Sequence, residues 1–194
     1  MIVSRYEMSL KDMIAMRVTD EYSIHRIVYS LFPIQKDQVR DFIFCDKGGT
    51  ATSRNILIVS KREPLKPQYG RVVSKTIPDS FLSHDRYGFE IKINPTYEIN
   101  RELFIVKGGE NILEWFKKDS PLWGFKVDPD HLDFLNLRIL KFKDKNLRNV
   151  TMGAATISGR LTVSDRDLFK RSFEYGINPG KCWGLGLLQL IVQN

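Results

Sequence analysis

Along this 194-residue chain, the spacing of the apolar residues switches several times between two periods. A period of about two residues marks strands, and one of about 3.6 residues marks helices. In the first half, residues 1–10 form a strand-like run. A helical stripe then extends from Ile24 to Phe32, and Pro33 follows as a stop signal. Three further strand-like runs complete this half: DFIFC, NILIVSK and RVVSKTIP. Residues 1–86 are therefore predicted to fold in the order β-α-β-β-β.

The second half repeats this order and adds a helix. Its predicted elements are, in sequence, strand 89–99, helix 111–118, strands 132–143 and 152–163, a helix between an N-cap at Ser164 and Gly176, and strand 184–192. The order β-α-β-β-α-β is that of a ferredoxin-like unit. We therefore predict an α+β chain of two tandem ferredoxin-like (RRM-like) domains, with antiparallel sheets and helices on one face, divided into residues 1–86 and 87–194.

The charge balance favours a polyanionic partner. The chain has 30 Lys and Arg residues against 23 Asp and Glu residues, which gives a net charge of +7. Lys and Arg that neutralise phosphates release counterions, so such a surplus favours nucleic-acid binding. The 42% hydrophobic and 27% charged content is typical of a globular protein and argues against disorder.

The sequence lacks the signals of metal sites and of membrane insertion. Cys45 and Cys182 lie far apart and in no CxxC pattern, so neither a zinc site nor a disulfide framework is expected. No apolar run approaches the roughly 20 residues that a membrane span needs, and the first residues do not resemble a signal peptide. We expect a cytoplasmic protein without metal or cofactor.

His25 is the histidine with the most informative surroundings. At roughly 100° per residue, His25 borders the apolar stripe of the predicted helix, and Tyr22 and Tyr29 project on the same flank. Arg26 lies further round and faces solvent. An imidazole, a phenol and a guanidinium therefore gather on one part of the helix. The pattern also fits a simpler interpretation, in which His25 is a boundary residue satisfied by a backbone carbonyl.

The glycine-rich segment 176–188 does not fit a nucleotide-binding loop. The glycine spacing before Lys181 is too short for a Walker motif, and Cys182 replaces the required Ser or Thr. The segment also follows a helix and enters a strand, which is the reverse of a phosphate loop. Two interpretations remain: tight packing between helix and strand, or a loop in which backbone N–H groups from Gly176 onward and Lys181 bind a phosphodiester.

Four segments together resemble the CRISPR-associated repeat-RNA endoribonucleases of the type I-E (Cascade) systems, the CasE family. They resemble its D-x-Y-x-x-H-R helix, its second-domain opening strand, its F-x-G-x-L-x-V strand and its glycine-rich terminus. In this chain they are Asp20–Arg26 followed by Leu31-Phe32, Ile93–Thr96, Ile157–Val163 and Gly176–Leu188. Their order and spacing span nearly the whole chain. One departure is Asn178, which stands where the family usually has glycine; Asn tolerates positive φ better than most residues.

This resemblance implies a metal-independent endoribonuclease that cuts CRISPR repeat hairpins to mature guide RNA. In this family the 2′-OH attacks the adjacent phosphate and leaves a 2′,3′-cyclic phosphate. The catalytic residues would be His25, as a general acid or base, and Tyr22, as a hydrogen-bond donor to the phosphate or 2′-OH. Arg26 or Lys181 would stabilise the developing charge. The product would stay bound, with the protein as a subunit beside other Cascade proteins.

RNA recognition is expected at a basic hairpin between the two long strands of the second half. Its residues are Arg138, Lys141, Lys143, Lys145 and Arg148. The alternative is a solvated hairpin tip without a partner. A second basic set is interpreted as nonspecific surface charge: Arg54, Lys61, Arg62, Lys66 and Arg71. A noncatalytic RNA-binding module of the same fold remains open, whereas a paired-RRM protein would show an aromatic RNP pattern that this sequence lacks.

Overall fold

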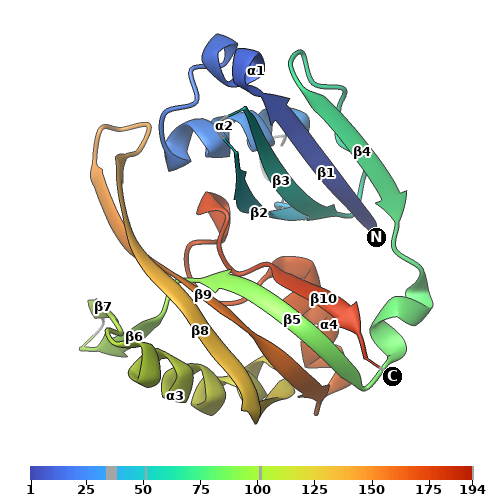
Figure 1. The fold of residues 1–194 in the computed structure, drawn as a ribbon, viewed down its shortest axis with the longest axis vertical. Coiled ribbons are helices and arrows are strands. Elements are labelled where there is room, and N and C mark those ends of the chain that lie inside the picture. Colours follow the sequence, from blue (N-terminus) through green and yellow to red (C-terminus); the bar gives the residue numbers. More distant parts are fainter. Residues whose placement is uncertain (34–38, 51, 101, 194) are drawn as a thin grey trace. The chain divides into compact units, whose positions relative to one another are not determined.

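The computed structural model describes residues 1–33, 39–50, 52–100 and 102–193. The chain divides into two compact units (Figure 1). The first consists of Met1–Pro78 together with Cys182–Gly184, and the second of Asp79–Lys181 together with the residues from Leu185 onward. The predicted division at 86/87 falls inside β5 of the second unit, and whether residues 1–86 and 87–194 fold as independent domains stays a prediction.

The first unit is built on one four-stranded antiparallel sheet. Its elements are β1 (Ile2–Ser9), α1 (Leu10–Ala15), α2 (Glu21–Leu31), β2 (Phe42–Gly49), β3 (Ser53–Ser60) and β4 (Arg71–Thr76). The strand order is β2-β3-β1-β4. The predicted order β-α-β-β-β is confirmed, with α1 as an addition. Helix α1 is only six residues long, so the helical spacing of its apolar residues Leu10, Met13 and Ile14 is too short a pattern to stand out in the sequence.

Helix α2 is fixed at its start and along one face. Asp20 caps it, with its side chain accepting a hydrogen bond from the backbone N–H of Ser23 at 2.8 Å. The buried side chains Ile24, Val28 and Leu31 pack in one cluster with residues of β1, β2 and β3. Burial of each such side chain stabilises the fold by about 1.5–3 kcal/mol, so the rotation of α2 about its axis is well determined.

The main sheet of the second unit also has four strands, two of which are longer than any in the first unit, and two helices cover it. Its elements are η1 (Asp79–Ser83), β5 (Arg86–Ile93), β6 (Thr96–Ile99), β7 (Glu102–Ile105), α3 (Gly109–Asp119), η2 (Ser120–Trp123), β8 (Phe125–Lys143), β9 (Asn149–Val163), α4 (Arg166–Tyr175) and β10 (Leu188–Val192). The main sheet has the order β10-β5-β9-β8. When its strands are numbered in chain order within the sheet itself, each four-stranded sheet has the order 4-1-3-2. The predicted α+β fold of two ferredoxin-like units is confirmed.

Two details of the predicted second half are wrong. The strand predicted at 89–99 ends at Ile93, because Pro95 cannot donate a ladder hydrogen bond, and residues 96–99 pair instead with β7 in a separate hairpin. The N-cap of α4 is Asp165 rather than Ser164. The Asp165 carboxylate accepts hydrogen bonds from the backbone N–H groups of Asp167 and Leu168, both at 3.0 Å.

Candidate active site

His25 is half-buried on α2, and one of its ring nitrogens is held by the main chain. Its Nδ1 lies 2.8 Å from the carbonyl oxygen of Cys182. Because a carbonyl only accepts hydrogen bonds, Nδ1 must carry the proton. Nε2 has no hydrogen-bond partner among the residues that the structure describes. The hydrogen bond to a backbone carbonyl that a boundary histidine is expected to make is thus present. It uses only Nδ1, so Nε2 can still accept a proton.

Aromatic rings surround the His25 imidazole. The ring centroid of Tyr29 lies 4.0 Å away, that of Trp183 4.7 Å away, and that of Tyr22 5.9 Å away and nearly parallel, at 17°. Tyr22 and Tyr29 come from α2 itself, three residues before and four after His25, as the helical spacing predicts. Trp183 was not predicted from the sequence. Its only signal there is an aromatic side chain between the glycines of the C-terminal segment.

The surroundings shift the proton affinity of His25 downward. Burial lowers the pKa of His25 most; the bond to the Cys182 carbonyl raises it, and the nearby charge of Arg40 lowers it again, so the net pKa lies below the ordinary value. The imidazole is therefore neutral at pH 7, with a lone pair on Nε2. Burial also raises the pKa of the Cys182 thiol, which argues against a thiolate nucleophile at this site.

Tyr22 and Arg26 lie together at the start of α2. The Arg26 guanidinium is 5.6 Å from the centroid of the Tyr22 ring, a cation–π contact, and its side chain is exposed. The Tyr22 hydroxyl has no hydrogen-bond partner among the described residues. The structure thus brings Tyr22 close to both His25 and Arg26. A hydroxyl donor and a positive charge can both reach an anion bound there.

Within the first unit, residues 182–184 lie close to β2 because position 184 is glycine. Gly184 has a φ of +81°, and a Cβ atom built on it would lie 2.9 Å from Cε2 of Phe44 in β2. Any larger residue would therefore need to move the backbone that carries the Cys182 carbonyl and the Trp183 ring. The sequence suggested tight packing here, and within the first unit that is what Gly184 allows.

The glycine-rich loop of the second unit is closed by its own hydrogen bonds. The Ile177 N–H donates to the Gly186 carbonyl at 2.9 Å, and the Gly186 N–H donates to the Lys92 carbonyl at 2.7 Å. Gly176 is buried, and its carbonyl accepts a hydrogen bond from Nζ of Lys181 at 3.3 Å. These bonds support tight packing between helix and strand. Binding of RNA by Gly176 and Lys181 stays a prediction.

Asn178 adopts the left-handed conformation that its place in the motif requires. Its φ is +63°, and its side-chain Nδ2 donates to the Asn94 carbonyl at 2.8 Å. Asn94 in turn accepts a hydrogen bond from the Gly153 N–H at 3.1 Å. The departure from glycine therefore adds a hydrogen bond that glycine could not make.

The basic hairpin presents its charges on more than one face. Lys141 and Lys143 are exposed and alternate with Leu140 and Phe142, which are buried. By the alternation of the strand, Arg138 lies on the same face of β8 as Leu140 and Phe142, although its own side chain is exposed. Only Lys141 and Lys143 thus lie together on one exposed face of β8.

The tip of this hairpin is partly neutralised. Arg148 forms an ion pair with Asp144, with 2.8 Å between Nε and Oδ2, and it is mostly exposed. Lys145 is exposed in the same turn. The Arg148 side chain is 73% exposed, so its guanidinium remains within reach of a further anion. Whether the hairpin binds RNA stays a prediction.

Within residues 1–33, 39–50, 52–100 and 102–193, no group of three or more His, Cys, Asp and Glu side chains could hold a metal ion. No helix in that same part of the chain is long and apolar enough to cross a membrane.

Two tandem ferredoxin-like units, one with an aromatic-lined imidazole held by a main-chain carbonyl, define an α+β protein with a candidate acid–base site. Residues 1–191 match the profile of the protein family described as CRISPR associated protein. The chain therefore belongs to this CRISPR-associated family, as its four motifs suggested. No curated protein sequence matches the chain.

Solved structures share the fold at low sequence identity. The CRISPR endoribonuclease Cse3 bound to a 19-nucleotide RNA is 19% identical, with a TM-score of 0.84 over 99% of this chain and 100% of that chain. Cas6e from Escherichia coli is 20% identical, with a TM-score of 0.74 over 98% of both chains. A chain of a CRISPR RNA-guided surveillance complex is 17% identical, with a TM-score of 0.69 over all of both chains.

Proposed function

We propose that the protein is a metal-independent endoribonuclease that cuts CRISPR repeat hairpin RNA to give guide RNA. The observation that carries this proposal is the neutral imidazole of His25, with Nδ1 protonated, near the Tyr22 hydroxyl; neither Nε2 nor that hydroxyl has a hydrogen-bond partner in the described part of the chain. Membership of the CRISPR-associated family and the fold shared with RNA-bound Cse3 support the choice of substrate.

The reaction needs a proton acceptor, a proton donor and stabilisation of negative charge. Nε2 of His25 accepts the proton of the ribose 2′-OH while the 2′-oxygen bonds to the adjacent phosphorus and the bond to the 5′-oxygen breaks. The leaving 5′-oxygen takes a proton from the imidazolium or from water, and a 2′,3′-cyclic phosphate remains. The Tyr22 hydroxyl donates to a phosphate oxygen, and Arg26 opposes the charge of the phosphorane. Lys181 is a further candidate for this last role.

The proposal of metal independence is supported by the chemistry that these side chains can supply. An imidazole with a lowered pKa can take a proton at pH 7, and a guanidinium keeps its charge at any physiological pH. Proton transfer and charge neutralisation thus need no Lewis acid. The proposal accordingly includes no cofactor.

RNA binding is assigned to the exposed basic side chains of the second unit. A-form RNA has a deep, narrow major groove that side chains cannot read, so contact is expected with the backbone and the end of the stem. Lys141 and Lys143, which share one face of β8, are the strongest candidates, and Arg138, Lys145 and Arg148 extend the set. We further propose that the protein keeps its product, acts in the cytoplasm and joins other Cascade subunits; the likeness to a chain of a surveillance complex supports the last of these.

The direct test is cleavage of the repeat hairpin from the protein's own CRISPR locus in the presence of EDTA. Wild type should give one specific cut with a 2′,3′-cyclic phosphate end, and a 2′-deoxy nucleotide 5′ of the cut should abolish it. His25→Ala should bind the hairpin without cutting it, whereas His131→Ala, an exposed histidine on β8, should cut normally. Cutting that requires added metal, or a fully active His25→Ala, would overturn the mechanism. Tight binding with no cleavage by wild type would favour a noncatalytic RNA-binding module.

A further inference from the structure

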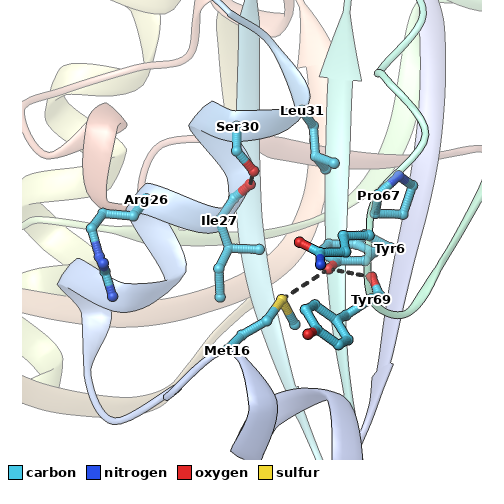
Figure 2. Close-up of a pocket in the computed structure, with 9 residues that line it drawn as sticks. Tyr6, Met16, Arg26, Ile27, Ser30, Leu31, Pro67 and Tyr69 are labelled. Atoms are coloured by element: carbon cyan, nitrogen blue, oxygen red, sulfur yellow. Dashed lines mark hydrogen bonds between the residues drawn. The ribbon is translucent and has the colours of Figure 1, made fainter.

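A second concave site lies on the opposite flank of α2 from the imidazole. It is a cavity of about 270 Å³ between α2, β1 and the segment 67–69 (Figure 2). Its walls are largely apolar and include Met16, Ile27, Leu31 and the ring of Tyr69. Ligand sites commonly combine such walls with a few polar groups, and at about 300–1,000 Å³ those for drug-sized molecules are larger than this one. The cavity therefore suits a smaller flat group.

The cavity is held open by hydrogen bonds and by a close backbone approach. The Tyr6 hydroxyl donates to the Tyr69 carbonyl at 2.8 Å, and its oxygen lies 3.6 Å from the sulfur of Met16 (Figure 2). Burial raises the pKa of Tyr6 to about 12, so the hydroxyl stays protonated and remains a donor. Gly70 has a φ of +73°, and a Cβ atom there would lie 2.6 Å from the Glu7 carbonyl. The site is thus formed before any ligand arrives.

The same segment is also fixed to the end of α2. The Leu65 N–H donates to the Leu31 carbonyl at 2.9 Å, which satisfies one of the last carbonyls of the helix. With Tyr6 bound to the Tyr69 carbonyl, both ends of the segment 65–69 are anchored. The side chain of Tyr69 is nevertheless 37% exposed, so its ring remains accessible to a ligand.

The polar groups around the cavity match a nucleotide. Gln68 lines it, and its amide offers a donor and an acceptor with no partner among the described residues. Arg26 lies at the rim, on the far side of Ile27 from Met16 (Figure 2). Unpaired RNA bases are recognised by stacking on aromatic side chains and by hydrogen bonds to their edges, with cations along the backbone. An aromatic wall, a free amide and a guanidinium provide all three.

Two further cations lie beside this segment. Lys66 and Arg71 are exposed, line the adjoining surface, and have no ion-pair partner in the part of the chain that is described. Both belong to the second basic set of the sequence, for which no specific partner was expected. Because these two cations lie beside an aromatic cavity, they have a candidate partner: the phosphates of a strand whose base enters the cavity.

We propose that this cavity binds one unpaired nucleobase of the RNA substrate, stacked on Tyr69 and hydrogen-bonded to Gln68, with the adjoining backbone running past Arg26. The inference rests on the proposed function, because the ligand is a nucleotide that flanks the cleaved hairpin. Arg26 contacts the Tyr22 ring and also lines the cavity. A base held there would therefore help to set which phosphodiester of the strand meets the catalytic groups.

The test measures equilibrium binding of uncleavable RNA, in which the nucleotide 5′ of the cut is 2′-deoxy. Each unpaired nucleotide that flanks the stem is replaced in turn by an abasic nucleotide, and Kd is measured by fluorescence anisotropy. For wild type, one position should weaken binding about tenfold when its base is removed, since stacking of a base on an aromatic ring is worth about 1–3 kcal/mol. In Tyr69→Ala the intact RNA should bind about tenfold more weakly, and removal of that base should then have no further effect.

Matched variants separate recognition from folding. Tyr69→Trp should restore the base dependence, and Gln68→Ala should reduce the preference among bases at that position. Tyr97→Ala, which removes another exposed tyrosine, on β6, should bind like wild type. If no flanking base is coupled to Tyr69, or if Tyr97→Ala has the same effect, the proposal is wrong. Failure of wild type to cut ribose RNA in EDTA would instead overturn the proposed function and leave this binding test intact; failure to bind RNA at all would overturn both.

Discussion

Helices α2 and α3 occupy the same topological place, since in chain order each lies between the first and second strands of its four-stranded sheet. The aromatic clusters around the two helices nevertheless differ in what they enclose. Around α3, Trp115 and Phe116 pack with Trp123 and Phe125, and the buried Nε1 of Trp115 has no hydrogen-bond partner among the described residues. Around α2, the cluster encloses an imidazole whose Nδ1 is satisfied by a carbonyl. The Cys182 carbonyl and the ionisable ring of His25 thus distinguish the candidate active site around α2 from the purely structural core around α3.

His25→Ala should have the largest effect of the changes to the α2 cluster. The single-turnover cleavage rate should fall about 10²–10⁴-fold, the usual range for loss of an acid–base group. Because the side chain is only half-buried, the free energy of unfolding should change little. Rates under saturating enzyme and a urea titration measure the two effects. An equal loss of stability and activity would mean that α2, like α3, only supports the fold.

The converse change is Phe116→Ala on α3. Its side chain is fully buried, so the free energy of unfolding should fall by about 3–5 kcal/mol. Urea denaturation followed by tryptophan fluorescence would report it, since Trp115 and Trp123 lie against this ring. His25 should keep its ordinary reactivity in the protein that remains folded. A variant as stable as wild type would contradict the assignment of α3 to packing.

Gly184→Ala tests how the carbonyl reaches His25. The new Cβ would meet Phe44, and alanine at positive φ is strained, at a cost of about 1–3 kcal/mol. Thermal unfolding should show this loss, and the cleavage rate should fall further than the loss of folded protein explains. Gly48→Ala is the matched control: its φ is +70°, but nothing lies within 4 Å of the added atom. Equal effects of the two changes would reduce the role of Gly184 to backbone strain.

The sequence predicted the elements better than it predicted the contacts between them. The stripe of Ile24, Val28 and Leu31 gave α2 its place and put His25 at its margin, because helical periodicity is a local property. Trp183 is 158 positions further along the chain than His25, counted as 183 minus 25, and no local pattern joins them. Helix α1 was not predicted for another reason: it is only six residues long, and so short a segment shows little more than one helical period.

The pH dependence of kcat/KM reports the protonation of His25 directly. The neutral imidazole is the active form, so activity should fall as the pH drops through the pKa of His25 in the free enzyme. Burial lowers that pKa, so the midpoint should lie below the ordinary histidine value. Trp183→Ala admits water to the ring and should move the midpoint upward, while Trp183→Phe should not. Among the described residues, the other groups near the ring are Tyr22, Tyr29, Arg40 and Cys182. A midpoint that is unmoved in Trp183→Ala would exclude desolvation by this side chain.

The smallest expected effect belongs to single lysines of the basic hairpin. If Lys143 neutralises one phosphate, Lys143→Ala should lower the slope of log Kd against log salt by about 0.7–0.9, with no change in the cleavage rate at saturation. Lys118→Ala provides the matched control, because Lys118 is an exposed lysine on α3. Fluorescence anisotropy across a salt series measures both slopes. Loss of a phosphate contact must reduce the number of counterions released. Equal slopes for Lys143→Ala and wild type would therefore show that Lys143 lies outside the RNA interface and that its charge on β8 is only solvated.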